Sequence, residues 1–251
     1  WITLSNQILA ARDAALGRSE HHMVVGDLSW DKQDRLGQSN CSVFKGTYTK
    51  GMVKRDCAIK KINHSGVPAE RSRCEREIQL LTMDCLKEQP NIITYYTHEE
   101  RDDSFYVAME LADGGTLRQF AELNQLGAWA QRKNFCRQLC SGLLGLHNKG
   151  SIIHRDLKPE NVMFVSKQYA RGDSSTVEWT LKIVDFGLSR NISASQSKRV
   201  SNVGAGTETW MPPEGLHRRH GTMSYDFSYD VHPCGSLLYF LLSGGEHAFP
   251  G

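Results

Sequence analysis

The run HRDLKPEN at positions 154–161 concentrates side chains that could do chemistry. It places a carboxylate at Asp156, an ammonium group at Lys158 and an amide at Asn161. A second carboxylate follows 24 residues after Asn161, at Asp185 in the tripeptide DFG. A carboxylate can accept a proton or orient a hydroxyl group, and carboxylate and amide oxygens are the ligands that hard cations such as Mg²⁺ prefer. Together these groups could position a hydroxyl, a metal ion and an anionic substrate.

Further motifs stand in a fixed order around this run. Lys60 ends the upstream tetrapeptide CAIK, Glu77 lies in an expected helix, and MPPE occupies positions 211–214. Each motif alone has an ordinary structural explanation: Lys60 could be a solvated strand end, and DFG a turn. Taken together, their order and spacing resemble the protein kinase superfamily over residues 28–251.

The resemblance implies a role for each catalytic residue. Asp156 would accept the proton of the attacking hydroxyl or orient it, and Lys158 would lie beside the transferring γ-phosphate. Thr207 would help to position both, while Asn161 and Asp185 would hold Mg²⁺. A lysine two residues after the aspartate resembles serine/threonine kinases more than tyrosine kinases. His154 would be structural, packing under Phe186.

The resemblance also implies an ATP site. Lys60 would bind the α- and β-phosphates, and Glu77 would hold Lys60 by an ion pair. Met109 would be the gatekeeper residue behind the adenine. Glu110–Ala112 would form the hinge, whose backbone recognises the adenine by hydrogen bonds. The purine would be enclosed by three apolar side chains: Val43, Ala58 and Met163.

The sequence departs from the family pattern in two places. The loop over the phosphates, residues 36–46, carries one glycine before its valine, Gly37, where the family has three. Glycine lets backbone N–H groups approach phosphate closely, so the loop predicts a poorer grip on nucleotide. The pair His232-Pro233 replaces an aromatic residue and a serine, and Pro233 is tolerable near the start of a helix.

Within the kinases, five segments resemble the inositol-requiring kinase–endoribonuclease sensors of the unfolded-protein response: REIQLL at 76–81, PNIITYY at 90–96, VAMEL at 107–111, GTETWMPPE at 206–214 and SGGEHAF at 243–249. The 2-5A-dependent ribonuclease is a more distant relative. This resemblance implies autophosphorylation in trans by a homodimer, a ribonuclease domain downstream, and a position facing the cytosol from the endoplasmic reticulum membrane. Another serine/threonine kinase remains the alternative.

The segment between Asp185 and Glu214 predicts regulation by phosphorylation. Four of its serines are the candidates, and they lie near basic residues: Ser193, Ser195, Ser197 and Ser201. Arg155, directly before Asp156, is the position that receives a loop phosphate in many kinases. A phosphoserine adds about −1.5 to −2 charges, enough to order such a loop on arginines.

Two other function classes remain open. A nucleotide-gated dimerisation module, controlling an attached ribonuclease without catalysis of its own, is favoured by the single-glycine loop and disfavoured by the complete catalytic set. A kinase-like nucleic-acid binder would need a basic stripe that the sequence lacks. We therefore expect no direct contact of this segment with nucleic acid.

Composition agrees with a globular protein. The 251 residues carry 30 Lys and Arg against 28 Asp and Glu, a net charge of +2, which gives no support for a general nucleic-acid or membrane-surface binder. No apolar run approaches the ~18–20 residues that span a bilayer, and no signal peptide begins the chain. The seven cysteines include no C-x-x-C pair, which favours a reducing, cytosol-facing location.

The elements that must hold these residues change character along the chain. Strand-like runs are expected at 42–48, 56–62, 92–97 and 105–111, interrupted by one helix at 70–83. Helices are expected at 116–124 and 128–148, and a hairpin with an elongated polar loop over 166–180. The pattern predicts an α+β, bilobal kinase fold: a helical extension at 1–27, a strand-rich N-lobe at 28–112 and a helical C-lobe at 113–251.

The segment 230–243 reads as a helix that is apolar almost all round, so nearly all of its sides should be buried. In the kinase fold several later helices cover one side of it. We therefore expect the C-lobe to continue beyond the 251 residues.

Overall fold

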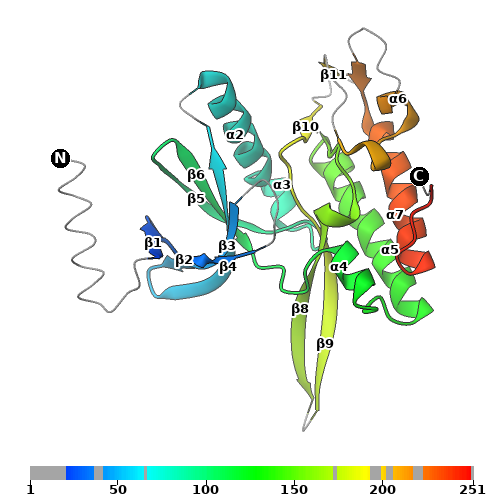
Figure 1. Cartoon of the computed structure of the whole chain (residues 1–251), viewed down its shortest axis with the longest axis horizontal. Coiled ribbons are helices and arrows are strands. Elements are labelled where there is room, and N and C mark those ends of the chain that lie inside the picture. Colours follow the sequence, from blue (N-terminus) through cyan, green and yellow to red (C-terminus); the bar gives the residue numbers. More distant parts are fainter. Residues whose placement is uncertain are drawn as a thin grey trace, which may run out of the picture. The chain divides into compact units, whose positions relative to one another are not determined.

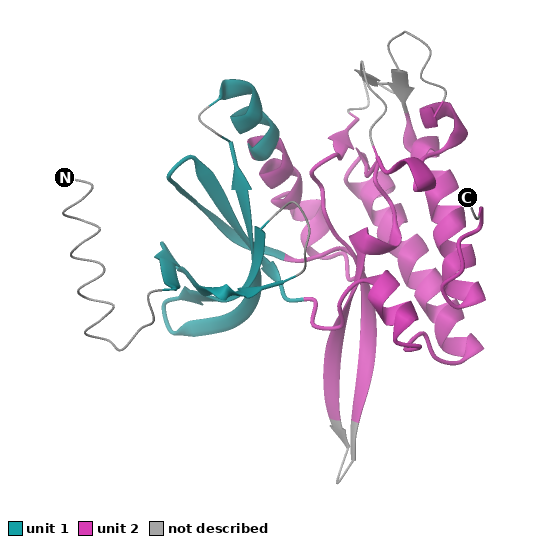
Figure 2. Cartoon of the chain, viewed as in Figure 1, with its two compact units in different colours: residues 1–74, 95–111 teal, residues 75–94, 112–251 magenta. Residues whose placement is uncertain are grey.

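The computed structural model describes residues 21–36, 42–64, 67–171, 174–192, 199–201, 206–216 and 223–249. The chain forms two compact units, one of residues 1–74 and 95–111 and one of residues 75–94 and 112–251 (Figure 2). The first is rich in strands and the second in helices, which confirms the expected α+β class (Figure 1). The boundary between the units falls within helix α2 (Pro68–Leu81), after Cys74.

The first unit is built on a six-stranded antiparallel sheet in the order β1-β2-β3-β4-β6-β5. Its strands are β1 (His22–Val25), β2 (Leu28–Arg35), β3 (Ser42–Lys50), β4 (Val53–Asn63), β5 (Tyr95–Arg101) and β6 (Ser104–Glu110). Because side chains alternate across a strand, each strand of this sheet presents two sets of residues. One set forms the core of the unit, where Trp30 packs at 5.1 Å from the Tyr106 ring and Cys57 and Ile59 are fully buried.

The second unit combines helices with a long β8–β9 hairpin and, among the described residues, two short strand pairs (Figure 1). Its helices are α3 (Asp84–Lys87), α4 (Leu117–Glu122), α5 (Trp129–Leu144), α6 (Pro213–Leu216) and α7 (Val231–Ser243), with shorter turns η1 (Gly145–Lys149), η2 (Pro159–Asn161), η3 (Glu208–Trp210) and η4 (Phe227–Asp230). Its strands are β7 (Ile152–Ile153), β8 (Val162–Arg171), β9 (Ser174–Ile183), β10 (Arg190–Asn191), β11 (Arg199–Ser201) and β12 (Met223–Tyr225).

The core of the second unit is aromatic. Phe120 on α4 is fully buried, stacks on Phe164 of β8 at 4.0 Å and meets Phe135 of α5 edge-on. Thr116 begins α4 with a reciprocal cap, since its hydroxyl accepts from the Gln119 N–H and the Gln119 side chain accepts from the Thr116 N–H. This core joins α4, α5 and the β8–β9 hairpin, which together carry the loops described below.

The β8–β9 hairpin corrects the expected loop. The polar segment 166–180 is not a loop, because β8 and β9 pair in register from Val162 opposite Ile183 to Arg171 opposite Ser174. Apolar residues alternate with polar ones from Val177 to Ile183 of β9, and the cross-strand pairs Lys167–Glu178 and Tyr169–Thr176 are favourable ones. The polarity of the segment reflects an extended ribbon with solvent on its faces.

Two further boundaries differ from expectation. The strand expected at 92–97 begins only at Tyr95, because Ile92 and Ile93 pair instead with Ile183 in the second unit. The helix expected at 128–148 ends as α5 at Leu144 and continues as the π-helical turn η1. The remaining predicted strands and helices, including α2, are confirmed within a few residues, and the N-terminal extension lies outside the described residues.

Helix α7 is less enclosed than its composition suggests. Leu237, Phe240 and Leu241 are buried, whereas Val231 and Tyr239 are exposed. Pro233 is the third residue of the helix, where its missing N–H removes no intrahelical hydrogen bond. Among the helices that the structure describes, none combines the length and apolar character needed to cross a membrane.

The aromatic core gives the first prediction. Phe120→Ala removes a fully buried ring from between Phe164 and Phe135 and should lower the free energy of unfolding by about 3–5 kcal/mol. Leu123→Ala, at the exposed end of the same helix, should change it by less than about 0.5 kcal/mol. Urea denaturation followed by circular dichroism measures both, and equal effects would contradict this description of the core.

Candidate active site

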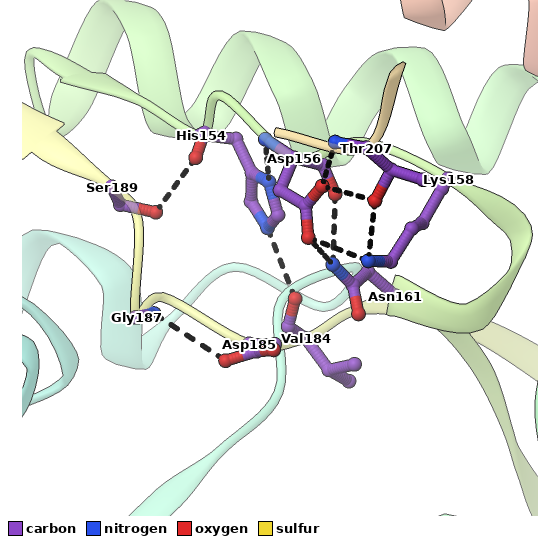
Figure 3. Close-up of polar contacts among 9 residues, drawn as sticks. All are labelled: His154, Asp156, Lys158, Asn161, Val184, Asp185, Gly187, Ser189 and Thr207. Atoms are coloured by element: carbon purple, nitrogen blue, oxygen red, sulfur yellow. Dashed lines mark hydrogen bonds and ion pairs between the residues drawn. The ribbon is translucent and has the colours of Figure 1, made fainter. Parts of the chain in front are cut away.

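The carboxylate of Asp156 is held on both of its oxygens (Figure 3). Oδ1 accepts from the backbone N–H and from the hydroxyl of Thr207, each at 2.9 Å. Oδ2 accepts from the Asn161 amide at 2.9 Å and pairs with the Lys158 ammonium at 2.8 Å. The ring of contacts closes because Lys158 Nζ also donates to Thr207 Oγ1, at 2.7 Å. Four residues predicted as catalytic therefore lie within hydrogen-bond distance of one another.

Thr207 reaches this position through the glycine before it. Gly206 has a φ of +123°, and a Cβ there would lie 2.6 Å from the backbone oxygen of Arg155. Any other residue would have to push the two segments apart. The close approach of Gly206 to the catalytic loop is thus what brings Thr207 against Asp156.

The carboxylate of Asp230, which is fully buried, fixes the backbone of the loop that precedes Asp156, which we call the catalytic loop. Its carboxylate accepts from the backbone N–H groups of His154 and Arg155, both at 2.8 Å, and contacts His147 Nε2 at 2.9 Å. Arg155 has a φ of +69°, a conformation that costs a non-glycine residue energy unless its surroundings enforce it. The two hydrogen bonds to Asp230 provide that enforcement, immediately before Asp156.

His154 connects this loop to the segment that holds Asp185. Its Nδ1 accepts from the Asp156 N–H at 3.3 Å, so Nε2 carries the proton and donates to the Val184 backbone oxygen at 3.0 Å. The ring meets Phe186 edge-on at 5.6 Å, which confirms the structural role expected for His154. Its backbone oxygen also accepts from the Ser189 hydroxyl, at 3.2 Å.

Asn161 and Asp185 suit the Mg²⁺ that the resemblance implies. The Asn161 amide nitrogen donates twice to Asp156, to its backbone oxygen at 2.8 Å and to its carboxylate, so the amide oxygen points elsewhere. The described residues contain no cluster of three His, Cys, Asp or Glu side chains that could hold a metal ion by themselves. One amide and one carboxylate match Mg²⁺, which is usually held by one or two protein oxygens together with phosphate oxygens and water.

Predicted nucleotide residues of the first unit share one face of the sheet. Lys60 pairs across the strands with Val43, and Ala58 pairs with Met109. Paired residues, and residues two apart in one strand, point to the same side, so these four side chains form one surface opposite the Trp30 core. Lys60 is 8% exposed, which rules out the solvated strand end as its explanation.

The other predicted site residues are placed separately. Glu110 ends β6, Ala112 begins the connector to α4, and Met163 on β8 pairs with Lys182 and bridges to Thr116. Glu77 is buried on α2, close to Gly187 of the DFG motif, where a Cβ would lie 3.4 Å from its Oε2. Gly37 lies outside the described residues.

The structure describes only some of the residues that are predicted to regulate the protein. Arg155 is buried, and its Nε donates to the Leu188 backbone oxygen at 2.7 Å, just after the DFG motif. Ser193, Ser195 and Ser197 lie outside the described residues, and Ser201 belongs to β11, where it pairs with Met223 of β12.

Sequence reasoning missed Asp230 and His147 as parts of the site. Asp230 was visible as the first residue of the motif DVHPCG, but nothing in the sequence shows which loop its carboxylate meets. Two cysteines, Cys57 and Cys234, are buried near these elements of the fold. Burial raises the pKa of Cys57 and of Cys234 to about 12 each, so both thiols are protonated at neutral pH and fill space.

The sequence of this chain is similar to those of several known proteins. A family model described as protein kinase domain matches residues 30–250. The human serine/threonine-protein kinase ULK1 is 30% identical over 223 residues, which are 88% of this chain and 20% of that protein. The human serine/threonine-protein kinase/endoribonuclease IRE2 is 31% identical over 235 residues, 92% of this chain and 23% of that protein. Calcium-dependent protein kinase 4 of Plasmodium falciparum is 31% identical over 216 residues, 80% of this chain and 36% of that protein. The chain thus spans about a fifth to a third of the length of these relatives.

The contacts of Asp230 give the second prediction. Asp230→Ala leaves two buried backbone N–H groups without an acceptor and should lower the free energy of unfolding by about 2–4 kcal/mol. Asp226→Ala is the control: it also loses a backbone hydrogen bond, to Ser228, but at an exposed cap, and should cost about 1 kcal/mol or less. Thermal unfolding of both variants is the measurement, and an Asp230→Ala protein as stable as the control would refute the assignment.

Proposed function

The chain belongs to the protein kinase family as a serine/threonine kinase domain, and on that premise we propose that Asp156, Lys158, Asn161 and Thr207 catalyse phosphoryl transfer in it. The family uses ATP as phosphoryl donor and Mg²⁺ as cofactor. The acceptor in this proposal is a serine or threonine hydroxyl of a protein. The observation that carries it is the closed set of contacts around the Asp156 carboxylate.

Phosphoryl transfer needs positioning and charge neutralisation more than covalent chemistry. Asp156 is oriented by Thr207 on one oxygen and by Asn161 on the other, which leaves its carboxylate fixed for the incoming hydroxyl. It orients that hydroxyl and takes up its proton. Lys158, held by Asp156 and Thr207, offers its positive charge to the phosphoryl group as negative charge develops there.

Asn161 and Asp185 would hold the metal ion. A Mg²⁺ ion held there would supply positive charge to neutralise the phosphates. Lys60 would bind the α- and β-phosphates with Glu77 as its partner, and Gly37 would contribute its backbone to the loop above them. Val43, Ala58, Met109 and Met163 would enclose the purine, and the backbone of Glu110 and Ala112 would hydrogen-bond it.

The finer proposal concerns biological context. Its support is the similarity to a kinase/endoribonuclease over 92% of this chain, together with the five subfamily motifs. We propose that residues 28–112 and 113–251 are the N- and C-lobes of such a protein, that it phosphorylates a second copy of itself, and that a ribonuclease domain is controlled by this dimer. It would face the cytosol from the endoplasmic reticulum membrane.

A nucleotide-gated scaffold is the alternative function. The single glycine in the phosphate loop favours it, because fewer backbone N–H groups can approach the phosphates. The two functions differ in what Asp156→Asn does: an enzyme loses its output, whereas a scaffold retains nucleotide-dependent dimerisation and whatever that dimer controls.

The third prediction tests catalysis. Asp156→Ala should reduce incorporation of labelled phosphate by about 100-fold or more, and removing Mg²⁺ with EDTA should abolish it. Thr207→Val keeps the shape of the side chain but loses both hydroxyl contacts, and should lower kcat by about 10- to 100-fold. Thr207→Ser keeps the hydroxyl and is the matched control. Equal incorporation by the wild type and Asp156→Ala would eliminate the enzyme proposal.

The fourth prediction tests regulation. After incubation with ATP and Mg²⁺, mass spectrometry should find phosphate on one or more of Ser193, Ser195, Ser197 and Ser201. The phosphate would be received by Arg155, so Arg155→Ala should weaken activation by phosphorylation while leaving the modification itself. Mixing an active copy with a tagged Asp156→Ala copy shows whether transfer occurs in trans. An active protein with an unmodified segment would contradict the proposal.

A further inference from the structure

A polar cluster surrounds the first turns of α2, within the first unit. His64 follows directly after the end of β4, Arg71 lies on the first turns of α2, and Glu100 lies on β5. All three side chains gather at Phe105 of β6, which is buried. We call these three residues the α2 clamp. None of them belongs to the predicted site.

The pair Arg71–Glu100 has the geometry of a specific contact. The two guanidinium nitrogens of Arg71 bind the two carboxylate oxygens of Glu100, Nη1 to Oε1 and Nη2 to Oε2 at 3.0 Å. The guanidinium also lies over the Phe105 ring, 5.5 Å from its centre. A bidentate fork between two planar groups restricts orientation as well as distance. Hydrogen bonding to Arg71 is also the main cause that lowers the pKa of Glu100.

His64 completes the clamp from the strand side. Its side chain is only 1% exposed, and its ring lies 5.2 Å from the Phe105 ring. Nε2 lies 3.6 Å from Glu100 Oε1, and neither ring nitrogen has a hydrogen-bond partner among the described residues. Its backbone accepts from Val67 at the entry to α2 and donates to Asp103 at the β5–β6 turn. The ring is therefore held between helix and sheet by packing and by the Glu100 charge.

The clamp restrains a helix that extends beyond it. Arg71 and Glu77 belong to the same continuous helix, six residues or about 9 Å apart along its axis. A second contact supports the same turns, because the Cys74 thiol meets the Asn63 backbone oxygen at the end of β4. A restraint on the first two turns therefore also restrains the position and rotation of Glu77.

We propose that Arg71, Glu100 and His64 are positioning residues for phosphoryl transfer, which restrain α2 so that Glu77 is presented in its working orientation. The proposal rests on the function proposed above for Glu77. The clamp residues touch neither nucleotide nor acceptor in it. They act by limiting how far α2 can turn or lift from the sheet face formed by β4, β5 and β6.

The test is a double-mutant cycle in the full chain. Glu100→Gln, Arg71→Gln and the double variant are compared for kcat, for KM of ATP, and for hydrogen exchange of the amides of residues 71–81. Because the two side chains form one pair, the double variant should be no worse than either single one. Asp84→Asn is the matched control, since it breaks an exposed ion pair with Lys87 on α3.

Glu100→Gln should lower kcat by about three- to tenfold with little change in the melting temperature, and should speed exchange in α2. Arg71→Lys keeps the charge but loses the fork, and should give an intermediate kcat. A kcat within about twofold of wild type and unchanged exchange in α2 would overturn the clamp and leave the kinase function standing. If the wild type transfers no phosphate, the proposed function fails, and the exchange of α2 still decides whether the clamp exists.

Discussion

Asp230 accepts hydrogen bonds from two consecutive backbone N–H groups, those of His154 and Arg155, with a carboxylate that is fully buried. These bonds hold Arg155 in its left-handed conformation, and that conformation turns the chain so that Asp156 faces Thr207 and Asn161. The geometry around Asp156 therefore depends on a buried carboxylate of the same helical unit. Helix α7 begins directly after Asp230, so the start of this helix carries the carboxylate that holds the backbone before Asp156.

The same design recurs in the other contacts of the site. His154 links the catalytic loop to Val184, and Gly206 allows Thr207 to come within hydrogen-bond distance of Asp156. Each contact fixes backbone in a segment that is irregular, where no ladder of strand or helix hydrogen bonds would do so. The side chains of Asp156, Lys158 and Thr207 are each held by at least two partners, an arrangement that would reduce the reorganisation needed during phosphoryl transfer.

The two units position their predicted site residues in different ways. In the first, strand alternation and the pairing register of β3, β4 and β6 place Val43, Ala58, Lys60 and Met109 on one face, opposite the core around Trp30. In the second, position depends on side-chain contacts between segments distant in the chain. Helix α2 belongs to both units, with its first turns held by Arg71 and Glu100 and its later turn carrying Glu77.

The sequence by itself determined the family, the α+β class, most strands and helices, and the identity of the groups around Asp156, because these depend on local periodicity and on long motifs. Only the tertiary structure decided that Asp230 holds the catalytic loop, that Ile92 and Ile93 pair with Ile183, and that the polar segment 166–180 is a paired ribbon. Those features depend on which partner a segment meets across the fold, and no local pattern or motif in the sequence identifies a partner that lies far away along the chain.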